Sequence, residues 1–259
     1  MARLLLIKLI FCLIQLHLFA QELVLEQSVT ADAVYLDQLN QIYLLNKKEH
    51  TISKYDLTGN LINKTSFNQG WDQAQLDVSD PFKIVLFYPG DFKIRLLDAQ
   101  LNEIGSFDDA DLNEQAAICY FTTDQIAVFS NNVLKLKNFR EPSEIQSARI
   151  LQSTALPNMG LPQLIQSNGF IYLFQPGVGI SRFNQQLFEE KRWQLNLIQA
   201  ASIVGDFIYY VERNKLFQMQ TLSLKETLIY TFTENSICFA VNTKIVVVLD
   251  GNILKVISL

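Results

Sequence analysis

The segment Lys83-Ile84-Val85-Leu86-Phe87 decides the fold, because five similar apolar runs recur along the chain at nearly constant spacing. The counterparts of Ile84, with 37 to 45 residues between neighbours, are Ile42, Ile126, Ile171, Ile208 and Ile245. Each run follows a turn-prone pair such as Asp80-Pro81, and Gly, Pro, Asn and Asp all favour tight turns. A repeat of this length indicates an array of six units of about 40 residues each.

A second segment follows each apolar run, and most of these segments alternate apolar and polar residues, as Lys93-Ile94-Arg95-Leu96-Leu97 does. Each unit is therefore predicted to contain a hairpin, with a less regular strand before it and, in the first five units, a fourth strand after it. A strand that is apolar on both faces lies between two packed sheets. We therefore predict an all-β fold, a six-bladed β-propeller of four-stranded antiparallel blades.

The sixth unit reaches Leu259 without a fourth strand, while Glu22–Val29 alternates as a strand should. We expect this N-terminal strand to join the last blade as its outer strand, which closes the ring and covers an open sheet edge. A β-sandwich is the alternative for a chain of this length. It needs Greek-key crossovers, however, and the sequence offers only sequential hairpins.

Residues 1–20 have the layout of a secretory signal peptide, with Arg3 and Lys8 before the apolar stretch Leu9–Phe19 and a small residue, Ala20, before the cut. Cleavage there leaves residues 21–259 as a single propeller domain. An uncleaved membrane anchor is the alternative, but polar residues interrupt the stretch, which falls short of the ~20 residues that span a bilayer. We expect no transmembrane segment in the mature chain, which is then an exported protein.

Composition limits the chemistry that the chain can perform. Its 21 Lys and Arg face 26 Asp and Glu, a formal net charge of −5, and there is no basic run, so we expect no nucleic-acid partner. His50 is the one histidine after cleavage, and we expect it in a solvated turn. A Ser-His-Asp triad and an imidazole metal site are therefore not expected. The sequence favours a protein that is not an enzyme and has no catalytic residue, metal or cofactor.

Cys119 and Cys238 occupy equivalent positions in the third and sixth units, seven residues before Ile126 and Ile245. Those units face each other across a six-membered ring. A disulfide needs Cα atoms within about 7 Å. We expect two separate, mostly buried thiols, although an exported protein can form a disulfide.

The second unit supplies the candidate binding residues. Trp71, Phe82, Tyr88, Pro89 and Phe92 lie in or beside its predicted loops, with Pro and Gly stiffening the turns. Aromatic side chains on rigid loops anchor contacts with proteins or sugars. The alternative is that these rings pack under their own loops as a small satellite core.

A second class of function is a carbohydrate-active or small-ligand-binding propeller that uses a pair of carboxylates at the channel mouth. The sequence alone selects no pair. The candidates by position are Asp32, Asp37, Asp77, Asp80, Asp108, Asp109, Asp111 and Asp124.

The segment Asp77–Tyr88 resembles one found in a family of secreted β-propeller proteins of Bacteroidota, and so do Asn40–Leu44 and Ile52–Gly59. The first unit also resembles an NHL-type repeat, and the signal ending Phe19-Ala20-Gln21 is similar to that group's. The close similarity covers roughly residues 30–100 and contains no catalytic motif. It implies a periplasmic module that binds another protein. A propeller of this kind is a plug-like subunit of the type IX secretion translocon at the inner face of the outer membrane, so the implied partner is an outer-membrane translocon.

Overall fold

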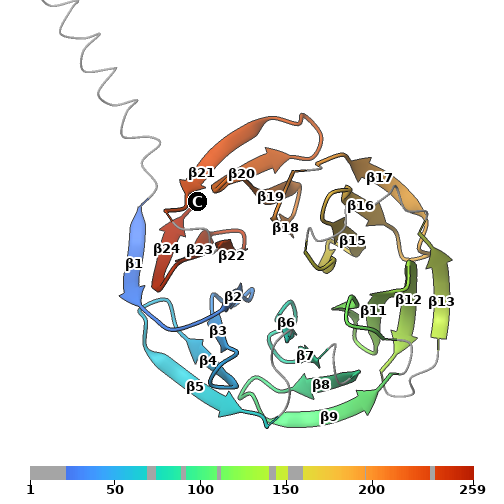
Figure 1. Ribbon diagram of the computed structural model, residues 1–259, viewed down its shortest axis with the longest axis horizontal. Coiled ribbons are helices and arrows are strands. Elements are labelled where there is room, and N and C mark those ends of the chain that lie inside the picture. The colour runs from blue at the N-terminus through green and yellow to red at the C-terminus, as the bar shows by residue number, and fades with distance from the viewer. Residues whose placement is uncertain are drawn as a thin grey trace, which may run out of the picture.

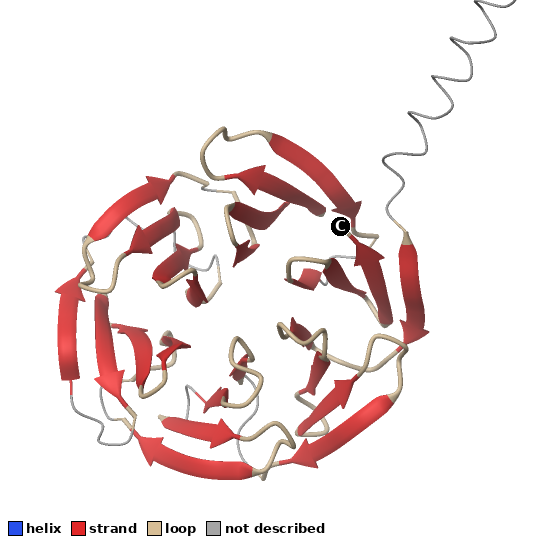
Figure 2. Cartoon of the chain, turned by 180° about the vertical axis from the view of Figure 1, so that it is seen from behind, coloured by secondary structure: helices blue, strands red, loops and turns tan. Residues whose placement is uncertain are grey.

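Six small antiparallel sheets surround a central channel in the computed structural model, and each sheet runs from the channel to the circumference (Figure 1). The structure describes residues 22–68, 74–88, 92–109, 112–139, 144–150, 160–195, 197–233 and 237–259. The predicted signal peptide lies outside these residues. Figure 2 shows the ring from behind, built of strands joined by loops. The predicted six-bladed propeller of four-stranded blades is confirmed.

Each blade contributes one strand to each of four concentric positions. The inner strands are β2 (Ala33–Leu36), β6 (Gln75–Asp77), β10 (Ala117–Thr122), β14 (Gln163–Ser167), β18 (Ala200–Val204) and β22 (Ile237–Val241). The second strands are β3 (Ile42–Asn46), β7 (Ile84–Tyr88), β11 (Gln125–Ser130), β15 (Phe170–Gln175), β19 (Phe207–Glu212) and β23 (Ile245–Asp250). The third strands are β4 (Thr51–Tyr55), β8 (Lys93–Leu97), β12 (Val133–Asn138), β16 (Gly179–Phe183), β20 (Lys215–Gln220) and β24 (Ile253–Ser258). The outer strands are β5 (Leu61–Ser66), β9 (Glu103–Asp108), β13 (Glu144–Arg149), β17 (Glu189–Trp193), β21 (Glu226–Thr231) and β1 (Leu23–Ser28).

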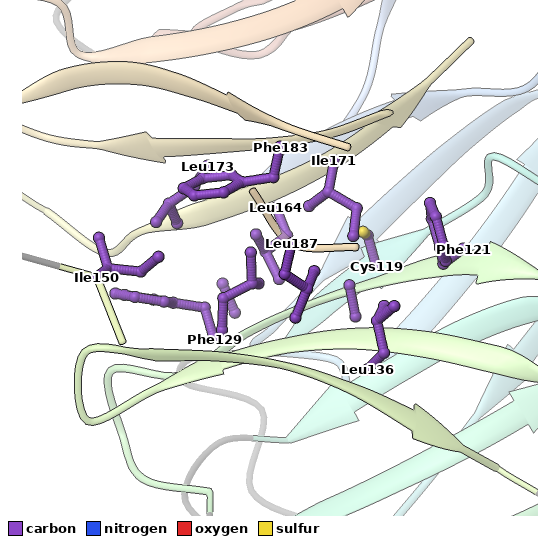
Figure 3. Close-up of a cluster of buried hydrophobic side chains, with 13 residues drawn as sticks. Cys119, Phe121, Phe129, Leu136, Ile150, Leu164, Ile171, Leu173, Phe183 and Leu187 are labelled. Carbon is purple, nitrogen blue, oxygen red and sulfur yellow. The ribbon is translucent and has the colours of Figure 1, made fainter. Parts of the chain in front are cut away.

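The second strands are buried on both faces, as their continuous apolar character predicts. Every residue of β3, β7 and β23 is buried. Their side chains pack into six apolar cores, and each core lies between two neighbouring blades. Figure 3 shows the core between the third and fourth blades, where Cys119 and Phe129 meet Leu173 and Phe183. The apolar area removed from water between blades, rather than within one sheet, therefore holds the ring together.

The N-terminal strand closes the ring. β1 pairs antiparallel with β24, and Leu23 lies opposite Ile257 while Ser28 lies opposite Ile253. The backbone N–H of Val29 also donates to the carbonyl of Asn252 at 2.8 Å. The predicted closure is therefore confirmed, and the edge of β24 that would otherwise be open is paired.

Three of the turns between third and fourth strands, in the first, second and fourth blades, share one arrangement. Asp56 Oδ1 accepts hydrogen bonds from the backbone N–H groups of Thr58 and Asn60, both at 2.9 Å. Asp98 and Asn184 accept in the same way from the residues two and four positions later. These side chains satisfy turn N–H groups that the sheet leaves unpaired, which explains why Asp and Asn punctuate a sequence that is poor in glycine.

In three blades, a side chain of the inner strand joins one blade to the next. It stands seven residues before the isoleucine that recurs in the second strand of each unit. The hydroxyl of Tyr35 accepts from the N–H of Leu76 at 3.3 Å, and Asp77 Oδ2 accepts from the N–H of Tyr120 at 2.6 Å. The sulfur of Cys238 occupies the same position in the last blade. These bonds satisfy backbone donors at the free edges of the inner strands.

Candidate functional site

The ring has two ends with different loops. We call the upper face the end that carries the loops between first and second strands and between third and fourth strands. The lower face carries the loops between second and third strands and the connections between blades. Because successive strands are antiparallel, every residue near a strand end is assigned to one face by the topology alone.

A groove opens on the upper face between the first and second blades, with a volume of about 230 Å³. Leu39, Ile62 and Phe82 form its apolar walls, and their exposed fractions are 53%, 50% and 65%. The other residues that line it are Gln41, Lys54, Asn63, Pro81, Ala99 and Gln100. This volume is below the ~300–1,000 Å³ of typical small-molecule sites. The groove therefore suits a single large side chain of a partner.

Lys54 forms the floor of this groove and joins the two blades. Its Nζ donates to the carbonyl of Ala99 at 2.8 Å and lies 5.3 Å from the centre of the Tyr43 ring. Burial lowers the pKa of Lys54, an effect opposed by the carboxylates of Asp37 and Asp98. Asn63 of the first blade also donates through its side-chain amide to the carbonyl of Gln100 in the second. The floor is thus fixed by hydrogen bonds between blades.

The loop that carries Phe82 is held by hydrogen bonds between side chains and its backbone. Asp80 Oδ1 accepts from the N–H of Phe82 at 2.9 Å, and the amide of Gln38 donates to the carbonyl of Ser79 at 3.2 Å. The ring of Phe82 therefore stands exposed on a loop whose position is set before any partner arrives. Pre-organised aromatic side chains lose little entropy on binding.

The structure separates the binding residues that the sequence suggests. Phe82 lies in the groove on the upper face, whereas Phe92, 43% exposed, lies between β7 and β8 on the lower face. Tyr88 is not a surface residue, because it is the last residue of β7 and is fully buried in the core between the first two blades. Trp71 and Pro89 lie outside the described residues.

The central channel is the larger concavity, with a volume of about 760 Å³ and walls built by the inner strands. Of the candidate carboxylates, Asp37 and Asp77 line it. Asp37 is buried, and it accepts from the N–H groups of Leu39 and Gln41 at 2.8 Å and from the Tyr43 hydroxyl at 3.0 Å.

Asp77 is engaged in the same way as Asp37. It accepts from the N–H of Ser79 at 2.8 Å and from that of Tyr120 at 2.6 Å, and burial raises its pKa. Both carboxylates therefore hold turns of their own blades, and Asp77 also joins the second blade to the third. Their hydrogen bonds give each of them a structural role at the wall of the channel.

The other acidic candidates are dispersed over the ring. Asp109 forms a buried ion pair with Lys137, and Asp108 lies 3.8 Å from Lys93 on the surface. Asp32 accepts from the N–H of Lys47 at 2.7 Å. Asp80 caps the loop of Phe82, Asp124 lies in the turn between β10 and β11, and Asp111 is outside the described residues.

The remaining groups with chemical potential are separate from one another. Cys119 and Cys238 are free thiols, as expected, and burial raises the pKa of Cys238 to about 11. His50 is exposed in the turn between β3 and β4. Within the described ranges, no three His, Cys, Asp or Glu side chains are grouped as metal ligands. Nor does the described part of the chain contain a helix that is long and apolar enough to cross a membrane.

Comparison with known proteins shows the fold but neither a family nor an activity. No protein-family model matches the chain, and no curated protein matches it. Among solved structures, virginiamycin B lyase from Staphylococcus aureus superposes with a TM-score of 0.65 at 10% identity, covering 93% of this chain and 100% of that one. The β-propeller domain of Myceliophteria thermophila Cps50 (Swd1) gives 0.66 at 11% identity, with coverage of 93% and 100%. The Neurospora crassa Pan2 WD40 domain gives 0.64 at 9%, with coverage of 92% and 95%. The chain is therefore similar to β-propellers of quite different kinds.

Sequence reasoning missed Leu39 and Ile62, two of the three apolar walls of the groove. Leu39 stands in a short turn and Ile62 directly follows another, so neither belongs to an aromatic loop. The available signal was the aliphatic residue that recurs near the start of several outer strands. Only the packing of two blades brings these positions beside Phe82.

Proposed function

We propose that this chain is a non-catalytic, exported β-propeller that binds another protein on its upper face, with Phe82 as the central anchor. The observation that carries the proposal is the exposed ring of Phe82 beside Leu39 and Ile62, over a groove whose floor is fixed by Lys54. Apolar side chains that are exposed together, on a pre-formed site, are typical of interaction surfaces.

The finer proposal concerns location and partner. The signal-like residues 1–20 and the resemblance to secreted Bacteroidota propellers support a periplasmic protein at the inner face of the outer membrane. There it would plug or regulate a protein-secretion channel of the type IX kind. The lyase among the similar structures shares the fold at 10% identity, which carries no activity over to this chain.

The test is site-specific photocrosslinking in the organism that encodes the protein. A benzophenone amino acid replaces Phe82 on the upper face in one variant and Phe92 on the lower face in the matched control. We expect one predominant crosslinked protein from position 82 and not from position 92. An outer-membrane translocon component in that product would support the finer proposal, and a different envelope protein would support only the coarser one.

The affinity of the propeller for the partner protein identified by crosslinking, purified on its own, then measures the contribution of Phe82. Truncation of a central aromatic anchor typically costs about 2 kcal/mol or more, which is roughly 30-fold in affinity. We therefore expect Phe82→Ala to weaken binding by about 30-fold and Phe92→Ala to leave it unchanged. Absence of any crosslinked protein from position 82, or equal affinities for both variants, would contradict the proposal.

The second candidate function is a propeller that binds a small ligand, or acts on a carbohydrate, in its channel. The channel volume of about 760 Å³ favours it, because it lies within the range of small-molecule sites. If a sugar were hydrolysed there by Asp37 and Asp77, Asp77→Asn would abolish the release of reducing sugar. Soluble glycans that neither raise the Tm nor are hydrolysed would eliminate this candidate.

A further inference from the structure

A structural irregularity recurs at the circumference of the ring. In five of the six blades, the outer strand contains a β-bulge near its upper end, where the pairing with the third strand slips by one residue. In the fifth blade the bulge lies at Ile229, toward the lower end of β21, and this residue is buried. The bulged residue is the extra one in the outer strand. A bulge re-aims a side chain and blunts a sheet edge.

In four consecutive blades the bulged residue is an exposed, β-branched aliphatic residue. We call these four residues the aliphatic belt: Val24, Ile62, Ile104 and Ile145. Their exposed fractions are 49%, 50%, 56% and 49%. They belong to β1, β5, β9 and β13, which follow one another around the ring (Figure 1).

The fold does not require aliphatic residues at these positions. In the fourth blade the same bulge contains Glu190, which is exposed and pairs with Arg182 at 3.0 Å. The lower ends of the four belt strands are polar: Ser28, Ser66, Asp108 and Arg149. The bulge therefore does not dictate the half-exposed valine and isoleucine that recur at one level of the ring, and their alignment with the apolar groove of Phe82 makes them candidates for a contact surface.

The charges beside the belt are acidic. Asp56, Asp80 and Asp98 stand in upper-face turns of the first two blades, and none of them is in an ion pair within the described ranges. Hydrogen bonds from Thr58 and Asn60 lower the pKa of Asp56 to about 2, so this carboxylate is ionised at neutral pH.

Three cations of the first two blades already have partners. Lys54 is buried under the groove, Lys83 donates to the carbonyl of Thr123 at 2.7 Å, and Arg95 pairs with Glu103. Lys64, on the same strand as Ile62, pairs with Glu49 of the lower-face turn at 3.4 Å. The exposed charge that remains in these upper-face turns of the first two blades is therefore negative. A partner with Lys or Arg side chains complements it, whereas an anionic lipid surface would be repelled.

The shape of the belt also argues against a second copy of this chain as the partner. The belt curves around four of the six blades, so it is convex, and two copies of a convex surface touch at only one blade. We propose that the aliphatic belt and the groove of Phe82 form one continuous docking surface for a protein that presents a concave, apolar surface bordered by Lys and Arg. This inference rests on the proposed protein-binding function and specifies the surface and the chemistry of its partner.

The experiment uses the full mature chain and the partner that crosslinks at position 82. The belt variant combines Val24→Ser, Ile62→Asn, Ile104→Asn and Ile145→Asn, and the matched control combines Ser28→Ala, Ser66→Ala, Asp108→Ala and Arg149→Ala at the lower ends of the same strands. We expect the belt variant to keep the wild-type Tm and to lose at least 100-fold in affinity, while the control loses less than threefold. Binding of the wild type should also weaken as NaCl is raised from 50 to 300 mM.

Different results would overturn the belt alone, overturn the proposed function as well, or identify a lipid surface or a second copy of the chain as the partner. Wild-type affinity in the belt variant, with Phe82→Ala still impaired, overturns the belt while leaving the proposed function intact. Absence of a partner at position 82 and at the four belt positions overturns both. Sedimentation of the wild type with vesicles of 30% phosphatidylglycerol and 70% phosphatidylcholine, lost in the belt variant, would identify a lipid surface instead. A dimer in light scattering that the belt variant dissociates would identify a second copy, and either result overturns the proposal.

Discussion

The sulfur of Cys238 accepts a hydrogen bond from the backbone N–H of Val34, 3.2 Å away, and thereby joins the last blade of the ring to the first. The two residues are far apart in sequence. Val34 belongs to the inner strand β2, which pairs with β3 along one edge only. The thiol is therefore part of the ring closure, in addition to the pairing of β1 with β24.

We predict that Cys238→Val destabilises the protein by about 1–2 kcal/mol, because it leaves the N–H of Val34 without its acceptor. Cys238→Ser keeps an acceptor at this position and should lose less. Urea unfolding followed by tryptophan fluorescence measures both variants. If the valine and serine variants were equally stable, the hydrogen bond would have no role in closure.

Deletion of residues 22–28 removes β1 and should lower the free energy of unfolding by about 2–5 kcal/mol. The backbone hydrogen bonds between β1 and β24 each contribute roughly 0.5–1.5 kcal/mol, and the deletion also uncovers the edge of β24. We expect oligomers in size-exclusion chromatography, and rescue by a synthetic peptide of residues 22–29. A chain that starts at Gln21 is the control, and a stable, monomeric deletion variant would contradict ring closure by β1.

Lys137 and Asp109 form an ion pair in which both side chains are almost fully buried. Lys137→Met leaves a buried carboxylate without its cation, and we expect a loss of about 3–5 kcal/mol. The exposed pair of Lys64 and Glu49 is the internal reference, for which Lys64→Met should cost less than about 1 kcal/mol. Similar losses in the two variants, measured by thermal and chemical unfolding, would show that burial does not set the strength of these pairs.

The lowered pKa of Asp56 predicts how the free energy of unfolding depends on pH. Its folded-state pKa, about 2, lies below the ordinary value of 3.8, so the carboxylate stabilises the fold above about pH 4. This stabilisation is lost as the pH falls from about 4 to about 2. Asp56→Asn keeps the acceptor oxygen and should flatten the dependence of unfolding free energy on pH in this window. Asp206→Asn, in another exposed upper-face turn, is the control, and an equal flattening there would argue against a specific role for Asp56.

The strands could be read from the sequence because a second strand packed on both faces must be apolar throughout, as Ile84–Phe87 is. The site could be read only in part. Phe82 and Phe92 are close in sequence but flank opposite ends of β7, so hairpin topology places them on opposite faces. Tyr88 extends the apolar run by one residue and is buried with it.

The groove itself depends on contacts between blades. Ile62 lies beside Phe82 only because the first blade packs on the second, and no local pattern encodes that distance. The β-bulge that exposes Ile62 was equally invisible, since its sequence differs little from that of a regular strand. Recurrence of an aliphatic residue at the same place in four units was the one signal that the sequence contained.

The central claim, that a partner protein docks on the upper face, is tested most directly by hydrogen–deuterium exchange of the protein with and without the partner that crosslinks at position 82. We predict slower exchange in residues 79–83 and 98–105 and no change in the lower-face turns at residues 47–50 and 212–215. Protection confined to the lower-face turns or to the inner strands around the channel would contradict the account.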